Sequence, residues 1–136
     1  MPPLIQWQDR YSVGVERIDR QHQELFRIVN RLAASITGQP SPATAAATMH
    51  EMCKYLDKHF QDEEQYLEKH PEFDRHNLAH LEFIEKTLDF QIRFADQAPD
   101  LHREMLAFLV EWLKTHILET DKLYFAYLKE HGLLDQ

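Results

Sequence analysis

Glycine and proline are confined to a few places in this 136-residue chain, and their placement limits the fold more than any other feature. Glycine occurs only at positions 14, 38 and 132, and proline only at 2, 3, 40, 42, 71 and 99. Because both residues interrupt helices, each long stretch between them can form a continuous helix. Apolar residues recur in these stretches every three or four positions, which is the period of an amphipathic helix. No alternating pattern typical of β-strands competes with it.

These stretches predict an all-α fold, with four helices in an up-down-up-down bundle. Short connections between long helices favour neighbours that run antiparallel. We expect an N-terminal arm, residues 1–18, to pack against the bundle, and the chain to form a single domain, residues 1–136. The four helices are expected at about residues 19–37, 42–70, 72–94 and 99–130.

Local sequence features suggest where these helices begin and which sides face the core. Asp19 is a candidate N-cap for the first helix, and Ser41 followed by Pro42 suits the start of the second. On the third helix, the expected core-facing stripe includes Phe83 and Leu88.

Composition excludes several classes of protein. The 23 acidic residues outnumber the 15 basic ones, giving a net charge of −8, and no run of Lys or Arg offers a surface to nucleic acid. No apolar segment reaches membrane length, so we expect no membrane insertion and a cytoplasmic protein. Cys53 is the only cysteine, which excludes an intrachain disulfide and a zinc site with several thiolates.

Polar side chains interrupt the apolar faces of all four expected helices. His59 and Glu63 lie four residues apart and share the inward face of the second helix, and His76 and His80 repeat this spacing on the third. Burying a carboxylate with several imidazoles is costly unless something compensates, and a metal centre would use all of them together. An up-down topology brings the candidate ligands to one level of the bundle: His22, His59, Glu63, His76, His80, His116 and Asp121.

Each candidate also has a structural explanation when taken alone. A single inward histidine is more often a hydrogen-bonded core residue than a ligand, and a single glutamate can pair along its own helix. Seven polar residues on four inward faces make that explanation improbable. The remaining histidines lack such partners and are expected at the surface or at helix ends: His50, His70, His102 and His131.

The spacing of His116 and Asp121 predicts an irregular helix. The two residues are five apart, and on a regular α-helix that step turns the second side chain roughly 140° away from the first. Both can serve one site only if the fourth helix is widened, kinked or ended there, for example by a π-bulge. A regular α-helix through residues 116–121 would count against Asp121 as a ligand.

The motifs that carry these residues resemble those of the hemerythrin family, and among them the stand-alone bacterial type, over essentially the full length of the chain. A single His-x-x-x-Glu motif would be a weak indication, but the ordered set at bundle-compatible intervals is specific. The matching segments are Trp7…Tyr11-Ser12-Val13-Gly14-Val15, Ile18-Asp19-Arg20-Gln21-His22, His59-Phe60-Gln61-Asp62-Glu63, His76-Asn77-Leu78-Ala79-His80 and His116-Ile117-Leu118-Glu119-Thr120-Asp121.

The resemblance implies a non-haem di-iron centre that binds dioxygen reversibly, with two iron ions per chain bridged by an oxo or hydroxo group. It also implies an apolar oxygen pocket or its surroundings, formed by Leu25, Trp112, Leu113 and Tyr124. The implied ligands are His76, His80 and His116 on one iron, His22 and His59 on the other, and Glu63 and Asp121 bridging both.

The implied ligand set favours an oxygen carrier or store over an enzyme. With the three bridges, three histidines fill six positions on one iron, whereas two histidines leave an open position on the other. The implied ligand set contains only two carboxylates, and the chain contains no Glu-x-x-His motif of the carboxylate-rich di-iron enzymes. A histidine-rich set is expected to leave the diferrous state accessible.

Other functions remain open at this point. The same site would suit an oxygen sensor, or a di-iron peroxidase, oxidase or nitric-oxide-handling protein. Iron storage and zinc binding are weaker alternatives. The expected partner is dioxygen itself, with an oxygen-consuming protein as a candidate recipient.

Overall fold

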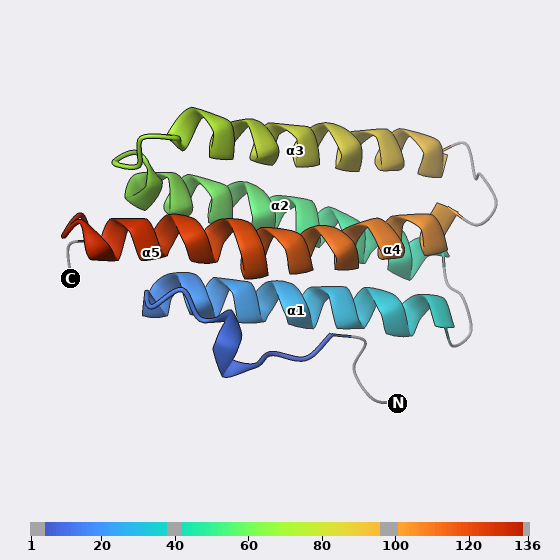
Figure 1. Ribbon diagram of the computed structural model, residues 1–136. Helices are drawn as coiled ribbons and strands as arrows, with labels where there is room; N and C mark the ends of the chain where they lie inside the picture. Colours follow the sequence, from blue (N-terminus) through green and yellow to red (C-terminus); the bar gives the residue numbers. More distant parts are fainter. Residues whose placement is uncertain (1–4, 38–41, 96–100, 135–136) are drawn as a thin grey trace.

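The computed structural model describes residues 5–37, 42–95 and 101–134 as a four-helix bundle, which confirms the expected fold class (Figure 1). Three of the rods are single helices, and the fourth consists of three segments that follow one another without a break. The helix α1 packs against α2 and α4, and α3 packs against α2 and α4. The elements are the 3-10 helix η1 (Asp9–Tyr11), α1 (Glu16–Thr37), α2 (Pro42–Leu67), α3 (Phe73–Ala95), α4 (Leu101–Lys114), the π-helix η2 (Thr115–Asp121) and α5 (Lys122–Glu130).

Helix α1 begins at Glu16 rather than at residue 19, and Asp19 is not its N-cap. The Asp19 carboxylate turns back toward the arm, where it accepts hydrogen bonds from the backbone N–H of Val13 (2.8 Å) and from the hydroxyl of Ser12 (2.5 Å). This side chain therefore fastens the arm to the first turn of α1. At the other end of the arm, the Asn30 amide bonds both backbone groups of Ile5.

The turn between α2 and α3 is longer than expected. Helix α2 ends at Leu67 rather than at residue 70, and α3 begins at Phe73. Pro71 disfavours helical geometry at His70, and the backbone N–H of His70 instead bonds the carbonyl of Leu67 (2.9 Å). The expected cap Ser41 and the expected start of the fourth helix at residue 99 lie outside the described residues.

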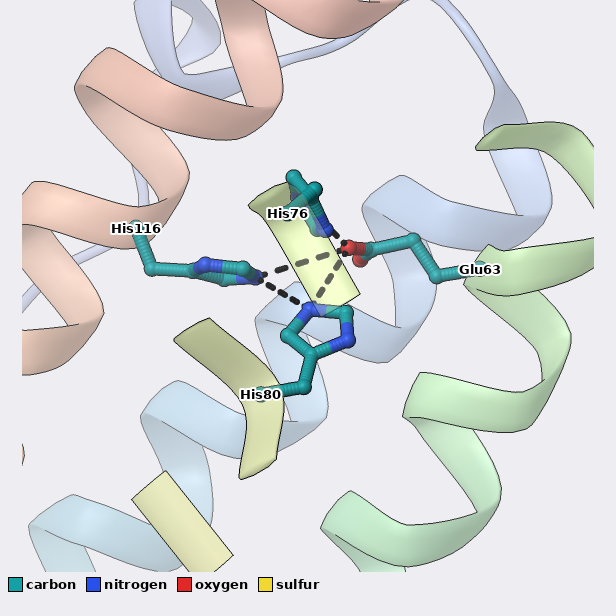
Figure 2. Close-up of side chains that lie close together, drawn as sticks. All are labelled: Glu63, His76, His80 and His116. Atoms are coloured by element: carbon teal, nitrogen blue, oxygen red, sulfur yellow. Dashed lines mark hydrogen bonds and ion pairs between the residues drawn. The ribbon is translucent and has the colours of Figure 1, made fainter. Parts of the chain in front are cut away.

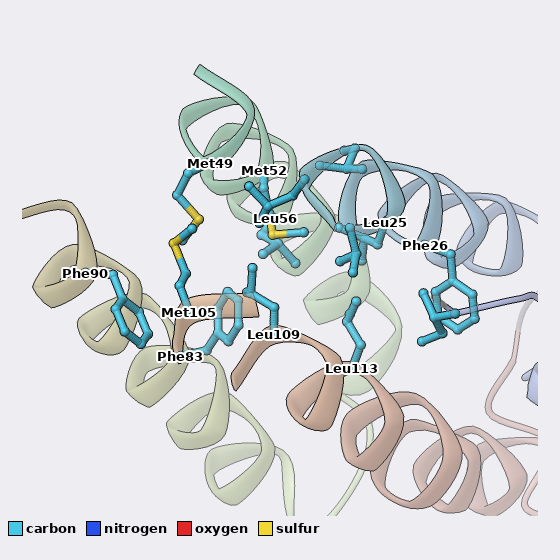
Figure 3. Packing of buried hydrophobic residues seen from close by; sticks show 14 of the residues in the cluster. Leu25, Phe26, Met49, Met52, Leu56, Phe83, Phe90, Met105, Leu109 and Leu113 are labelled. Atoms are coloured by element: carbon cyan, nitrogen blue, oxygen red, sulfur yellow. The ribbon is translucent and has the colours of Figure 1, made fainter. Parts of the chain in front are cut away.

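Two apolar clusters fill the bundle and leave a polar layer between them. The larger cluster includes Leu25, Leu56 and Leu113, which project into the same interior from three helices (Figure 3). The smaller cluster lies at the other end and is made by Val13, Val15, Ile18, Leu67, Phe125 and Leu128. Along α1, α2 and the fourth rod, the inward polar residues fall between members of the two clusters. On α3 they fall between Phe73, which packs against the smaller cluster, and Phe83 of the larger one. Apolar side chains therefore enclose the polar residues on both sides.

The expected core stripe of α3 was wrong at Leu88, whose side chain is 52% exposed. The buried residues of this helix instead continue the four-and-three spacing from His80 through Phe83, Thr87 and Phe90. The hydroxyl of Thr87 is satisfied by the carbonyl of Ile84 (2.9 Å), so this polar residue can lie in the core. In the part of the chain that the structure describes, no helix combines the length and apolar character needed to cross a membrane.

Candidate metal centre

All seven candidate ligands meet in the polar layer between the two apolar clusters. Their side chains come from all four rods, and none is more than 4% exposed. They form two overlapping groups with ligand atoms within 4.8 Å of one another. One group contains Glu63, His76, His80 and His116, and the other contains His22, His59, Glu63 and Asp121.

Glu63 lies at the centre of the cluster and faces both groups. The carboxylate points toward the three-histidine group (Figure 2), and its Oε1 is 3.3–3.5 Å from the Nε2 atoms of these histidines. Its Oε2 faces the other way, at 2.8 Å from Nε2 of His59 and 3.5 Å from Nε2 of His22. The two oxygens of one carboxylate are thus divided between three histidines and two.

Asp121 spans the same two groups from the fourth rod. Its Oδ1 is 2.7 Å from Nε2 of His76, and its Oδ2 is 3.1 Å from Nε2 of His22 and 3.0 Å from Nε2 of His116. The cluster therefore contains two carboxylates, and each contacts histidines from both groups.

The π-helix η2 makes this position of Asp121 possible. It covers Thr115–Asp121 and is flanked by the regular helices α4 and α5, which confirms the irregularity expected between residues 116 and 121. A π-helix has more residues per turn than an α-helix, so a five-residue step returns close to the same face. His116 and Asp121 consequently both point into the bundle.

The cluster has the polar atoms that a metal pair requires. Nε2 of His22 and of His59, both oxygens of Glu63, and Oδ2 of Asp121 are buried without a hydrogen-bond partner, although they approach one another closely. Buried polar atoms are ordinarily paired, and atoms that converge without hydrogen-bond geometry are suited to share a cation. Imidazole and carboxylate together are a ligand set used by non-haem iron. The residues fit a metal pair.

Aromatic rings enclose the three-histidine side of the cluster. The ring of Phe60 stacks on that of His80 with centroids 3.8 Å apart, and Trp112 stacks on His116 at 4.3 Å. Phe60 also contacts Trp112 edge to face at 5.8 Å. Phe60 was not among the residues predicted to surround the site, although it directly follows His59 in the sequence.

The remaining residues expected in or around an oxygen pocket lie on two sides of the candidate ligands. Leu25 and Leu113 are each 1% exposed and belong to the larger apolar cluster. Leu25 follows His22 by three residues, and Leu113 precedes His116 by three residues. Tyr124 lies on the opposite side, with its ring 4.7 Å from that of His76. Its hydroxyl donates to the carbonyl of Glu72 (3.3 Å), which holds the ring against this histidine of the cluster.

Hydrogen bonds also reach the cluster from residues outside it, and the helical pattern of the sequence does not predict them. Nδ1 of His59 lies 2.6 Å from Oε1 of Gln21, whose Nε2 donates to Asp62 (2.7 Å). Both residues adjoin candidate ligands in the sequence, Gln21 before His22 and Asp62 before Glu63. An amide and a carboxylate at the edge of otherwise apolar faces were the only indication of this role.

The histidines expected at the surface do not join the cluster, as far as the described side chains show. His50 and His131 are exposed, and His131 stacks on Tyr127 with centroids 3.9 Å apart. His70 is half-buried and stacks on Tyr124 at 4.1 Å.

Burial and charge interactions shift the pKa values within the cluster in opposite directions. Burial would lower the pKa of His116, but the carboxylates of Asp121 and Glu63 outweigh burial and raise it to about 10. Burial lowers the pKa of His80 to about 4, and contact with Glu63 offsets only part of that shift. Burial would raise the pKa of Glu63, but His59 and the other histidines hold it well below its usual range. The Glu63 carboxylate therefore stays ionised, and its negative charge favours either protonated histidines or metal ions beside it.

These shifts predict that the metal-free protein is most stable near pH 6.5. Above that pH the unfolded state loses a proton that His116 retains up to about pH 10, so stability falls as pH rises. Below it, the unfolded state gains a proton that His80 does not take up until about pH 4, so stability falls as pH drops. Thermal denaturation of metal-free protein from pH 4 to 10 measures this. A midpoint that stays constant or keeps rising above pH 6.5 would contradict it.

Comparison with known proteins assigns the chain to a family. Residues 13–128 match the model of the hemerythrin HHE cation binding domain. The chain is 34% identical to the bacteriohemerythrin of Clostridium acetobutylicum, covering 89% of this chain and 98% of that protein. It is 29% identical to the myohemerythrin of Theromyzon tessulatum, covering 91% and 93%. A crystal structure of wild-type hemerythrin superposes with a TM-score of 0.80 at 26% identity, covering 90% of this chain and 96% of that chain. This chain belongs to the hemerythrin family.

Proposed function

We propose that this chain binds dioxygen reversibly at a non-haem di-iron centre and serves as an oxygen carrier or store. The observation that carries the proposal is the division of the Glu63 carboxylate, with Oε1 toward three histidines and Oε2 toward two. A carboxylate placed in this way is suited to bridge two metal ions. The family to which the chain belongs is named for cation binding, and its curated relatives are hemerythrins.

The contacts support a specific distribution of ligands. Two iron ions, bridged by an oxo or hydroxo group, would supply the electrons that bind dioxygen. The two groups of histidines differ by one member, so the iron with fewer histidines would keep an open position for a small ligand. We assign His76, His80 and His116 to one iron, His22 and His59 to the other, and Glu63 and Asp121 to both.

Apolar and aromatic side chains would keep water away from the centre. Phe60 and Trp112 cover the rings of His80 and His116, and Leu25 and Leu113 close the same end of the polar layer. Excluding water limits the supply of protons and competing ligands. Bound dioxygen would therefore be released unchanged more readily than it would be displaced by water or another ligand.

The same cluster argues for a carrier rather than an enzyme. It contains five imidazoles and only two carboxylates, whereas bundle-type di-iron enzymes use two Glu-x-x-His motifs with two further glutamates. Five neutral histidines add no negative charge with which to stabilise highly oxidised iron. The physiological recipient is proposed only as an oxygen-consuming protein.

Oxygen cycling of the iron-loaded protein tests the proposal. Anaerobic reduction, exposure to air and renewed deoxygenation are followed by visible absorption, with iron counted per chain. We expect two iron ions per chain and a charge-transfer band that forms in air and disappears on deoxygenation through several cycles. Irreversible bleaching would contradict a carrier, and repeated turnover with an added electron donor would indicate a peroxidase or oxidase.

A further inference from the structure

A series of hydrogen-bonded side chains connects one histidine of the cluster to the protein surface; we call it the hydrogen-bonded chain. Nδ1 of His59 lies 2.6 Å from Oε1 of Gln21, and Nε2 of Gln21 donates to Oδ2 of Asp62 (2.7 Å). The other oxygen of Asp62 accepts from the guanidinium of Arg17 at 3.0 Å. The Asp62 side chain is 11% exposed and that of Arg17 is 52% exposed, so the chain begins in solvent and ends at the buried cluster.

The hydrogen-bonding chemistry of these four groups allows only one direction. A guanidinium can only donate, and an ionised carboxylate can only accept. The amide of Gln21 must therefore turn its NH2 group toward Asp62 and its carbonyl toward His59. The carbonyl accepts, so Nδ1 of His59 must carry a proton, and the lone pair of the neutral ring is left on Nε2. That nitrogen is the atom that faces Glu63, at 2.8 Å.

Three of the other four histidines of the cluster lack this support. Nδ1 of His22, of His76 and of His80 is buried without a hydrogen-bond partner among the described residues. Their Nδ1 atoms therefore have no acceptor that would hold the proton on that nitrogen. Ligand histidines are ordinarily oriented by a hydrogen bond to the other ring nitrogen, which sets the tautomer and the ring position.

We propose that Gln21 and Asp62, anchored by Arg17, are positioning residues that fix the metal-binding tautomer of His59. Because His59 belongs to the two-histidine group, the hydrogen-bonded chain supports metal binding at that position and not at the three-histidine position. The inference rests on the proposed di-iron function and deepens it, since this is the position assigned an open site for dioxygen. Loss of the hydrogen-bonded chain should weaken binding of the iron at the two-histidine position and leave the three-histidine iron in place.

Asp62→Asn tests the direction of the chain without changing its size. Arg17 would hold the carbonyl of the new amide, so the new NH2 group would face Gln21. The amide of Gln21 would then turn its own NH2 group toward His59, whose Nδ1 would have to accept and whose Nε2 would carry the proton. That tautomer cannot bind a metal through Nε2. Asp57→Asn makes the same change of charge at an exposed position on the same helix and serves as the control.

The measurement is the release of iron from the loaded protein to a coloured ferrous chelator. Wild type and Asp57→Asn are expected to release two irons slowly. Asp62→Asn should release one iron roughly 10–100-fold faster, the usual cost of removing such a supporting group, and the other at the wild-type rate. Helical circular dichroism before chelation verifies that each variant is folded.

A double variant separates positioning from general stabilisation. If Asp62 acts through Gln21, then Asp62→Asn should add no further acceleration in a Gln21→Leu background. Additive effects, equal acceleration of both irons, or an unchanged rate for Asp62→Asn would overturn the inference while leaving the di-iron function intact. Fewer than two irons in the wild-type protein would overturn the proposed function and this inference with it.

Discussion

Glu63→Gln is expected to abolish the iron pair. The Glu63 carboxylate is the one group that faces all five histidines of the cluster, and the substitution replaces an oxygen with an NH2 group that cannot bind a cation. It also removes one of the two carboxylate charges that face the histidines. Iron bound per chain should fall from two to one or none, and the reversible absorption band should be lost. Iron analysis of the purified variant, with helical circular dichroism, measures this.

Glu64→Gln is the matched control for that substitution. Glu64 is the next residue of α2, is half-buried outside the cluster, and loses the same charge on replacement. It should retain two irons and cycle normally with oxygen. A Glu63→Gln protein that keeps two irons would remove Glu63 from its assigned bridging role.

Leu113→Ala is expected to leave the iron pair in place but to shorten the life of the oxygen complex. The side chain is 1% exposed and lies in the apolar cluster next to His116, so truncation opens space through which water and protons reach the centre. The protein should lose roughly 2–5 kcal/mol of unfolding free energy, the usual cost of this truncation in a core. Stopped-flow absorption in air measures the rate of irreversible oxidation, and thermal denaturation measures stability.

Leu109→Ala distinguishes a pocket residue from an ordinary core residue. Leu109 is fully buried in the same cluster, on the same helix, one turn further from His116. It should lose a similar amount of stability with little change in oxidation rate. Equal oxidation rates in the two variants would remove Leu113 from the proposed oxygen pocket.

The bundle and the polar layer could be predicted because both follow from patterns along single helices. The three-and-four spacing of apolar residues indicated the rods, and polar residues that kept this spacing, such as His59 and Glu63, indicated a buried site. The five-residue step from His116 to Asp121 went further and predicted a helix irregularity between these residues, which in the structure is a π-helix. A pattern that departs from the helical period by one residue is informative when both residues must face inward.

Features that depend on contacts between helices were not predictable in the same way. Gln21 supports His59 across 38 positions of sequence, and nothing in either residue's neighbours specifies that pairing. Leu88 is apolar but lies just outside the buried face of α3, because the rotation of a helix about its axis is set by its partners. Asp19 has the chemistry of an N-cap, yet its carboxylate is used by the arm, which the helical pattern does not describe.

Iron-edge anomalous diffraction from crystals of the loaded protein tests the central claim most directly. We expect two anomalous peaks inside the bundle, one beside the Nε2 atoms of His76, His80 and His116 and the other beside those of His22 and His59, with Glu63 between them. A single peak, or peaks located away from these seven side chains, would contradict the account.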